Sequence, residues 1–296
     1  MNKTNQRIAM EVSRNTIIAN VFLALFKLAA GILGHSAAMI SDAVHSLSDV
    51  LSTVIVIIGI RLAGQAPDKE HPYGHDRLEC VAALILSFIL FATGLNIGGS
   101  GIRTILNGHY DQLTIPGTIA LTAAVISIIV KEIMYWYTRK AAKTINSGAL
   151  LADAWHHRSD ALSSIGSFIG ILGARIGFPV LDSAACLFIC LFIFKVAYDV
   201  FKDAISKMTD RACDDQTVTS MSLVILAQEQ VLTIDQLKTR LFGNRIYVDV
   251  EISVYKEFPL HISHEIAHTV HDALEKEFPE IKHCMVHVNP SDLTEA

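Results

Sequence analysis

The sequence predicts an α-helical membrane protein, in which a six-transmembrane-helix bundle is followed by a small cytoplasmic α+β domain. Hydrophobic residues make up 51% of the 296 positions, and the mean hydropathy of +0.41 is too high for an ordinary soluble domain of this size. Stretches of roughly 17 to 25 predominantly apolar residues, long enough to cross a bilayer, recur along the chain as far as residue 204. Beyond residue 208 the composition changes and acidic residues become frequent.

The candidate spans differ in how purely apolar they are. The third is the clearest, because no charged residue occurs between Val81 and Ile102, whereas the second and the fifth contain histidine and aspartate. Ionisable groups inside a bilayer are costly unless they face a bundle interior or an aqueous cavity, so these two spans predict a functional site. The six spans lie near residues 13–33, 37–62, 80–104, 113–136, 151–175 and 181–204.

The basic residues predict that both termini lie in the cytoplasm. Lysine and arginine gather before the first span and after the second, fourth and sixth, while the other connections carry only Arg103 and Arg175. This orientation makes residues 1–12 a cytoplasmic segment, 13–207 the six-helix transmembrane domain and 208–296 a cytoplasmic domain. We expect a multi-pass protein of the cell inner (cytoplasmic) membrane. No basic stripe with interleaved aromatics occurs, which argues against a nucleic-acid partner.

The periodicity of the tail predicts a small folded domain. Apolar and polar residues alternate over 245–254, as expected for a strand, and a second short strand covers 284–288. Between them, Ile262, Ile266, Val270 and Leu274 recur at helical spacing. The order helix, strand, strand, helix, strand predicts an α+β domain of about 85 residues.

Two four-residue intervals carry the chemistry of the predicted bundle: His45-x-x-x-Asp49 in the second span and His156-x-x-x-Asp160 in the fifth. Residues four apart lie on one face of a helix, so each interval is a pair of potential ligands. Two such helices facing each other would supply two imidazoles and two carboxylates. Zn²⁺ accepts this ligand set, and two carboxylates neutralise a dication, which reduces the cost of holding it at membrane depth. We predict a divalent-metal site.

Polar neighbours of this site have other interpretations. Asp42 and Asp153 each lie three residues before a predicted ligand, and they either orient the ligands or line the cavity. His157 points about 100° away from His156 around the helix, so we expect a neighbour and not a ligand. A metal binds only the neutral imidazole, so metal and protons would compete for His45 and His156.

A second group of potential ligands lies in the cytoplasmic connection between the second and third spans. Asp68, His71 and His75 offer one carboxylate and two imidazoles within eight residues. As a bare pattern, this group is either a metal site or a solvated loop near the membrane surface.

The tail is rich in histidine at regular intervals, so several imidazoles share one helix face and two share a strand face. The run from His264 to His268 also satisfies the HExxH pattern of zinc proteases, with Glu265 as the base. Such a protease needs a third ligand and a cleft, for which a domain of about 85 residues leaves little room. We therefore do not expect an enzyme. The histidines are His261, His264, His268, His271, His283 and His287.

Three motifs, in this order, resemble those of the cation diffusion facilitator family of divalent-metal transporters. They are Gly34-His-Ser-Ala-Ala-Met-Ile-Ser-Asp-Ala-Val-His-Ser-Leu-Ser-Asp49, His71-Pro-Tyr-Gly-His-Asp-Arg-Leu-Glu79 and Ala152-Asp-Ala-Trp-His-His-Arg-Ser-Asp160. The resemblance covers nearly the whole chain. It implies a six-helix domain, a ferredoxin-like (metallochaperone-like) cytoplasmic domain, a homodimer, and export of metal from the cytoplasm in exchange for protons.

The resemblance also implies roles for residues outside the bundle. It gives Asp68, His71 and His75 a metal-binding role. It pairs Arg77 with Asp210 as charges that tie the two domains together, where the alternative is two unrelated charges near the membrane.

In the tail, the resemblance supports His264 and His287 as metal ligands, with Asp249 as a possible partner. Asp235 stands where some members carry histidine. Asn289 stands where some relatives have a ligating aspartate, so the occupancy or the metal preference of this cluster would differ from that of those relatives. The alternative is that the histidines form a solvated polar helix face and bind no metal.

These observations predict a secondary active transporter that exports divalent cations in exchange for protons. Two histidines and two aspartates suit Zn²⁺ best and are compatible with Cd²⁺, Co²⁺, Ni²⁺, Fe²⁺ and Mn²⁺. We expect a second copy of the chain and the lipid bilayer as partners, and no organic cofactor. Two alternatives stay open: a membrane metal sensor or assembly scaffold with a vestigial transport site, and a membrane-embedded metalloenzyme, which would need an open water position and a general base.

Overall fold

The computed structural model describes residues 3–33, 37–107, 118–175 and 180–292. The chain divides into two compact units, Met1–Ile205 and Ser206–Ala296.

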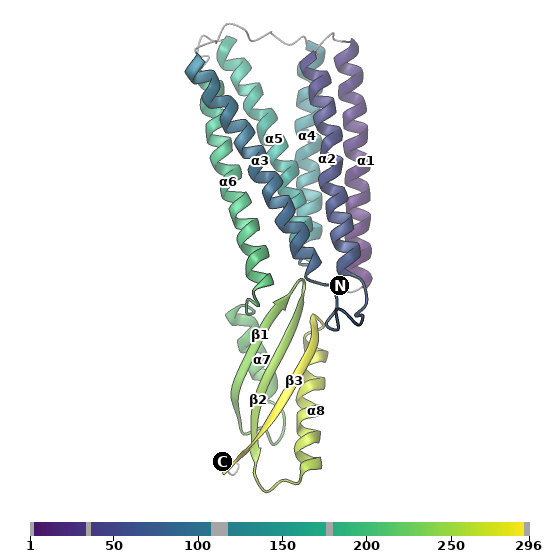
Figure 1. Cartoon of the computed structure of the whole chain (residues 1–296), viewed down its shortest axis with the longest axis vertical. Coiled ribbons are helices and arrows are strands. Elements are labelled where there is room, and N and C mark those ends of the chain that lie inside the picture. Colours follow the sequence, from purple (N-terminus) through teal and green to yellow (C-terminus); the bar gives the residue numbers. More distant parts are fainter. Residues whose placement is uncertain (1–2, 34–36, 108–117, 176–179, 293–296) are drawn as a thin grey trace. The chain divides into compact units, whose positions relative to one another are not determined.

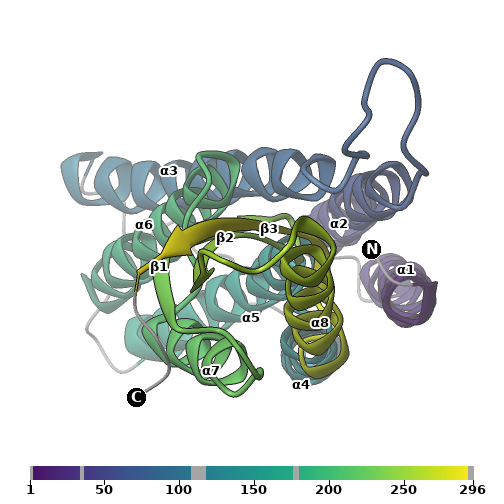
Figure 2. The same cartoon turned by 90° about the horizontal axis from the view of Figure 1, so that it is seen from below.

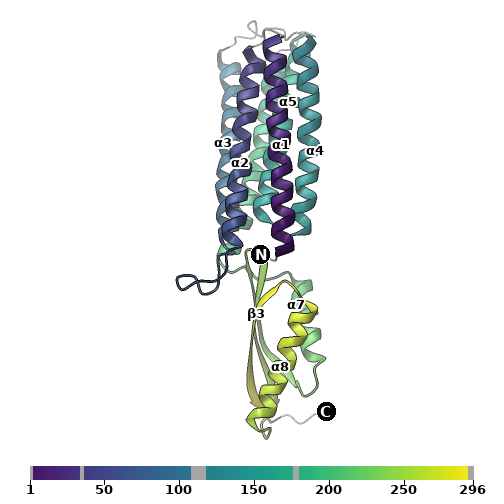
Figure 3. The same ribbon diagram turned by 90° about the vertical axis from the view of Figure 1, so that its right-hand side faces the viewer.

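The first unit is a bundle of long helices. Its described residues form six of them, of 27 to 31 residues each. A helix rises about 1.5 Å per residue, so each is long enough for a hydrocarbon core of about 30 Å. Figures 1 and 3 show the helices side by side along their lengths, which confirms the predicted six-helix fold. They are α1 (Lys3–Leu33), α2 (Ala37–Ala63), α3 (Leu78–Asn107), α4 (Thr118–Thr144), α5 (Gly148–Arg175) and α6 (Val180–Met208).

Length and composition alone identify fewer membrane spans than the bundle has helices. Over the described residues, two segments are long and apolar enough by that test, Thr4–Ala30 and Leu78–Arg103. Helices α2, α4 and α5 carry Asp49, Lys131 and Asp160, and all three side chains are buried. Charged groups that face the bundle interior lower the hydropathy of a helix without exposing charge to lipid.

The bundle interior and its outer surface are both apolar. Val56, Ile60 and Leu86 are fully buried where α2 and α3 pack together. Phe22, on α1, and Phe188, on α6, are large apolar side chains that remain mostly exposed. Exposed apolar surface on this scale is unusual for a soluble monomer and suits a helix bundle surrounded by lipid.

Helices α2 and α3 approach closely at a glycine. A Cβ atom added to Gly59, on α2, would clash with the Cβ of Ala82 on α3, whereas one added to Gly99 on α3 would meet nothing within 4 Å. We predict that Gly59→Ala destabilises the bundle by about 1–3 kcal/mol, because the two backbones must separate. Gly99→Ala is the matched control and should be neutral or stabilising. Thermal unfolding of the purified variants in detergent compares them, and equal midpoints would contradict a tight contact.

The second unit contains two helices and a three-stranded sheet among its described residues. The elements follow the predicted order: α7 (Asp215–Leu226), β1 (Thr233–Phe242), β2 (Arg245–Tyr255), α8 (Leu260–Glu277) and β3 (Ile281–Ser291). The strand order is β1-β2-β3, with β1 antiparallel and β3 parallel to β2. Figure 2 shows α7 and α8 on the same face of this sheet.

Alternation along β2 creates the core of the second unit. Val248, Val250 and Ile252 are almost fully buried and pack in one cluster with Val270 and Leu274 of α8. Side chains of successive strand residues point to opposite faces of a sheet. Asp249 and Glu251, which alternate with these three buried residues, therefore lie on the face away from both helices. Potential ligands on the strands and on α8 are therefore separated when the strand residues lie on that outer face.

Candidate metal centre

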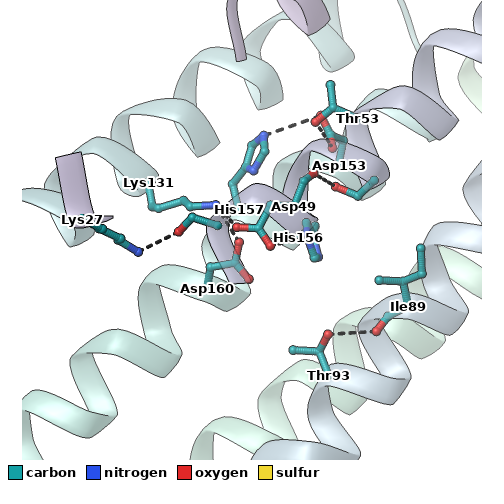
Figure 4. A network of polar contacts seen from close by, with 12 residues as sticks. Lys27, Asp49, Thr53, Ile89, Thr93, Lys131, Asp153, His156, His157 and Asp160 are labelled. Atoms are coloured by element: carbon teal, nitrogen blue, oxygen red, sulfur yellow. Dashed lines mark hydrogen bonds and ion pairs between the residues drawn. The ribbon is translucent and has the colours of Figure 1, made fainter. Parts of the chain in front are cut away.

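Asp49 of α2 and His156 and Asp160 of α5 meet inside the first unit. One ligand atom from each of the three lies within 4.8 Å of the others. The three residues are 3%, 4% and 8% exposed. Asp49 Oδ1 lies 3.6 Å from His156 Nε2, and Figure 4 shows the three side chains converging. The predicted meeting of the second and fifth spans is therefore present, with two carboxylates and one imidazole at a buried position.

Helical spacing explains how α5 supplies two of these groups. His156 and Asp160 are one turn apart and share a face of the helix, which faces Asp49 on α2. His45 lies one turn before Asp49 on α2, but its side chain, like that of Asp42, falls outside the described residues. The role of His45 as the fourth ligand stays a prediction.

Three of the potential ligand atoms in this group have no hydrogen-bond partner among the described residues. Within the described part of the chain, both ring nitrogens of His156 and Oδ1 of Asp160 are buried without a hydrogen bond. Buried polar atoms are nearly always paired, so unpaired ones need an explanation. A cation bound between them would provide it, because it would contact a ring nitrogen and a carboxylate oxygen together.

Lys131 of α4 belongs to the same site, and the sequence interpretation missed it. Its Nζ donates to Asp49 Oδ2 at 2.6 Å and to Asp160 Oδ2 at 2.9 Å. The residue is 2% exposed. The available signal was a lysine within the predicted fourth span, which the rule for ionisable groups in membranes marks as functional in the same way as histidine and aspartate.

A second buried polar pair lies beside the candidate metal ligands. His157 Nε2 is 3.6 Å from Asp153 Oδ2, and Thr53 Oγ1 donates to Asp153 Oδ1 at 3.2 Å. Neither His157 nor Asp153 is exposed to solvent. His157 is thus directed to Asp153, in keeping with the prediction that it is a neighbour of the metal ligands. Asp153 contacts His157 and Thr53, which links α5 to α2.

The loop between α2 and α3 brings its three predicted ligands together. Asp68, His71 and His75 each offer an atom within 4.8 Å of the others. The carboxylate of Asp68 lies 3.5 Å from His71 Nδ1 and 3.5 Å from His75 Nε2. The side chain of His75 is 9% exposed, whereas those of Asp68 and His71 are more than half exposed. Figure 3 shows this loop projecting from the end of the bundle.

Backbone contacts fix the loop in this form. The amides of His71 and Glu70 donate to Asp68 Oδ1 at 2.6 and 2.9 Å. Gly74 has a φ of 90°, a conformation that favours glycine, and its amide donates to the carbonyl of His71. The hydrogen bond from the His71 amide, followed by that from Glu70, lowers the pKa of Asp68, so its carboxylate is available as a ligand.

The tail does not bring its predicted ligands together within one chain. Asp249 pairs in register with Met285, and His287 pairs with Glu251, on the sheet face away from the helices. His264 lies on α8, which packs against the opposite face. Among the described residues, the two groups of three close ligands are the central and loop groups. The sheet lies between Asp249 and His287 on one side and His264 on the other, and the metal-binding role of these three residues stays a prediction.

A different polar cluster occupies the end of the sheet. Asn289 Nδ2 donates to Asp235 Oδ2 at 2.8 Å, and Ser253 Oγ donates to the same oxygen at 2.7 Å. These bonds, with that from Asn289 the larger influence, lower the pKa of Asp235. Asn289 therefore acts as a hydrogen-bond donor to a carboxylate at the position where an aspartate ligand was considered.

The predicted charge pair joins residues of different units. Arg77 belongs to the first unit, and Asp210 belongs to the second, where it has a φ of 60°. The pairing stays a prediction.

Comparison with known proteins defines the class of this bundle and its tail. Residues 15–209 match the cation efflux transmembrane domain, and residues 213–291 match the cytoplasmic domain of cation efflux proteins. The chain is 34% identical to the manganese efflux system protein MneS of Bacillus subtilis, over 93% of each chain. It is 29% identical to the manganese efflux system protein MneP of the same organism, over 98% of this chain and 99% of that one. A transporter of Methanocaldococcus jannaschii is 34% identical over 94% and 96%.

The class is therefore a membrane transporter that exports divalent metal cations. The chain belongs to the cation diffusion facilitator family. Members of this family are transporters and not enzymes, which agrees with the interpretation of the HExxH run as a helix face. In the structure His264 and His268 are exposed on α8, with ring centroids 4.7 Å apart. The second matched domain is the dimerisation domain of the family.

Proposed function

We propose that this transporter exports Zn²⁺ from the cytoplasm in exchange for protons, with Asp49, His156 and Asp160 as ligands and His45 as the fourth. The observation that carries the proposal is the buried group of two carboxylates and one imidazole, whose ligand atoms lie within 4.8 Å of one another. Mixed nitrogen and oxygen ligands in a four-coordinate arrangement are typical of Zn²⁺.

Mn²⁺ is the second candidate for the transported ion. The relatives MneS and MneP are named as manganese efflux proteins. Mn²⁺ prefers carboxylate oxygen, and this site offers two carboxylates together with imidazole. Cd²⁺, Co²⁺, Ni²⁺ and Fe²⁺ are compatible with the same ligands and belong in the same competition assay.

Competition for imidazole supports the exchange with protons. A metal ion binds only the neutral ring nitrogen, so loading His156 with metal requires that it carries no extra proton, and protonation expels the metal. A site that alternates between the two sides of the membrane would then carry metal in one direction and protons in the other.

The remaining parts of the chain fit a regulated dimer in the inner membrane. We propose that both termini face the cytoplasm, that two copies associate through residues 208–296, and that Arg77 and Asp210 form a charge pair between the domains. Asp249, His264 and His287 retain a proposed metal-binding role only if ligands from the second copy complete their sites.

Flux measurements in proteoliposomes test the proposal. The purified chain is reconstituted, a pH gradient is imposed, and uptake of Zn²⁺, Mn²⁺ and the other ions is followed together with luminal pH. We expect metal uptake that depends on the gradient and moves protons in the opposite direction. Metal binding without flux would favour the alternative of a sensor or assembly scaffold. Flux that does not depend on the pH gradient would contradict the exchange with protons.

The loop group is predicted to supply ions to the transporter from the cytoplasm without being the transport site. His75→Ala removes the least exposed of its three ligands. We expect the metal concentration for half-maximal flux to rise by about threefold to tenfold, since one lost ligand corresponds to about 1 kcal/mol at an exposed site. The maximal flux should be unchanged. His283→Ala, in the tail, is the matched control, and loss of maximal flux in His75→Ala would contradict a purely supplying role.

A further inference from the structure

We infer that Lys131 is a tethered counter-cation, which holds the two metal-binding carboxylates in the metal-free transporter and leaves them when a divalent ion binds. Lys131 thereby weakens metal binding and promotes release. The inference rests on the proposed function of the central site.

The hydrogen bonds place the ammonium group between two helices. Nζ of Lys131 contacts Oδ2 of Asp49, on α2, and Oδ2 of Asp160, on α5, at 2.6 and 2.9 Å. Figure 4 shows the lysine entering the group from the side of α4. The other oxygen of Asp49 faces His156, and the other oxygen of Asp160 is unpaired among the described residues. Lys131 thus uses one oxygen of each carboxylate that the metal ion would need.

The charge balance favours exchange over joint occupancy. Two carboxylates and one ammonium carry a net charge of about −1, which a dication would change to about +1 if the lysine stayed. The side chains of Lys131 and Asp49 are almost fully buried, so solvent screens this repulsion weakly. An ammonium group has no lone pair with which to bind metal. Its flexible four-carbon stem allows the group to withdraw without a movement of α4.

The exchange has a consequence for release of the ion. Two unpaired carboxylates in a buried site are costly, so a site without a counter-cation would hold its metal tightly. When Lys131 returns, it replaces part of the lost attraction as the metal leaves. A second buried lysine beside this site, Lys27, donates to the hydroxyl of Ser46 at 2.8 Å.

Binding of Co²⁺ to the full-length chain in detergent micelles tests the inference. The visible absorption of Co²⁺ reports its coordination, and every protein carries His75→Ala so that the loop group does not contribute. Lys131→Met removes the charge and keeps the length of the side chain. Lys131→Arg keeps the charge and is the matched control. We expect Lys131→Met to bind Co²⁺ about tenfold more tightly or better, since a nearby like charge has gone, and Lys131→Arg to resemble the parent.

Thermal unfolding gives a second readout. Without metal, Lys131→Met should unfold at a lower temperature than the parent, and the rise on adding Co²⁺ should be larger, because metal then supplies the missing cation. Lys131→Gln keeps a donor for the carboxylates and serves if the methionine variant does not fold; the same tightening is expected.

The variant Asp49→Asn distinguishes failure of the proposed metal site from failure of the proposed role of Lys131. If the parent and Asp49→Asn bind Co²⁺ equally, the central group is not the metal site and the proposed function fails. If Asp49→Asn loses binding but both neutral variants of Lys131 bind as the parent does, or more weakly, Lys131 is a structural ion pair and the inference is overturned.

Discussion

Asp49→Asn is expected to reduce metal flux by about 100-fold or more while the protein remains folded in the membrane. The substitution removes one charged ligand and leaves Lys131 with a neutral amide in place of one of its two carboxylate acceptors. A dication in the variant site would keep only one of two neutralising carboxylates, and a 100-fold loss corresponds to about 3 kcal/mol because about 1.4 kcal/mol is a factor of ten. Flux into proteoliposomes, at the metal concentration that gives half-maximal flux in the parent, measures the effect.

Ser52→Ala is the matched control for this prediction. Ser52 is buried on the same helix, and its Oγ donates to the backbone carbonyl of Asp49 at 2.7 Å. Its removal leaves the carboxylate in place, so flux should stay within about twofold of the parent, as expected for loss of a hydrogen bond of about 0.5 kcal/mol. Flux in Asp49→Asn equal to that of Ser52→Ala would exclude Asp49 from transport.

The fold and much of the candidate site could be predicted from the sequence because both depend on local periodicity. The helical stretches before residue 208 and the order of elements after it follow from apolar spacing and alternation, and the structure has both. The meeting of Asp49, His156 and Asp160 could also be expected, since burial of charge in two spans requires the charges to share an interior position. The loop group could be predicted because its three potential ligands are close together in the sequence.

What could not be predicted depends on contacts between distant segments. A lysine inside a predicted span marks Lys131 as functional, but no ligand spacing surrounds it, and its two partners are known only once α4 packs beside α2 and α5. In the tail, helical spacing correctly predicts that His264 and His268 share a face. It does not tell which side of the sheet that face lies on, so the sequence could not show that His264 and His287 lie on opposite sides of the sheet.

The ion that the site prefers depends on the single imidazole described there, so His156 is the position at which selectivity should change most. His156→Glu is expected to raise the ratio of Mn²⁺ to Zn²⁺ transport by about tenfold or more. Glutamate extends its carboxylate about as far as the Nε2 atom that lies 3.6 Å from Asp49. The described ligands then become all oxygen, which favours harder ions such as Mn²⁺ over Zn²⁺.

A competition assay with both ions outside the same proteoliposomes measures the ratio directly, so a general loss of activity does not disguise the result. His157→Asn is the matched control, because His157 is equally buried one residue along α5 but is directed to Asp153. Its ratio should equal that of the parent even if its stability falls. An unchanged ratio in His156→Glu would mean that selectivity is set before the ion reaches the bundle, and the loop group of Asp68, His71 and His75, with its own mixed ligands, would then be the place to change it.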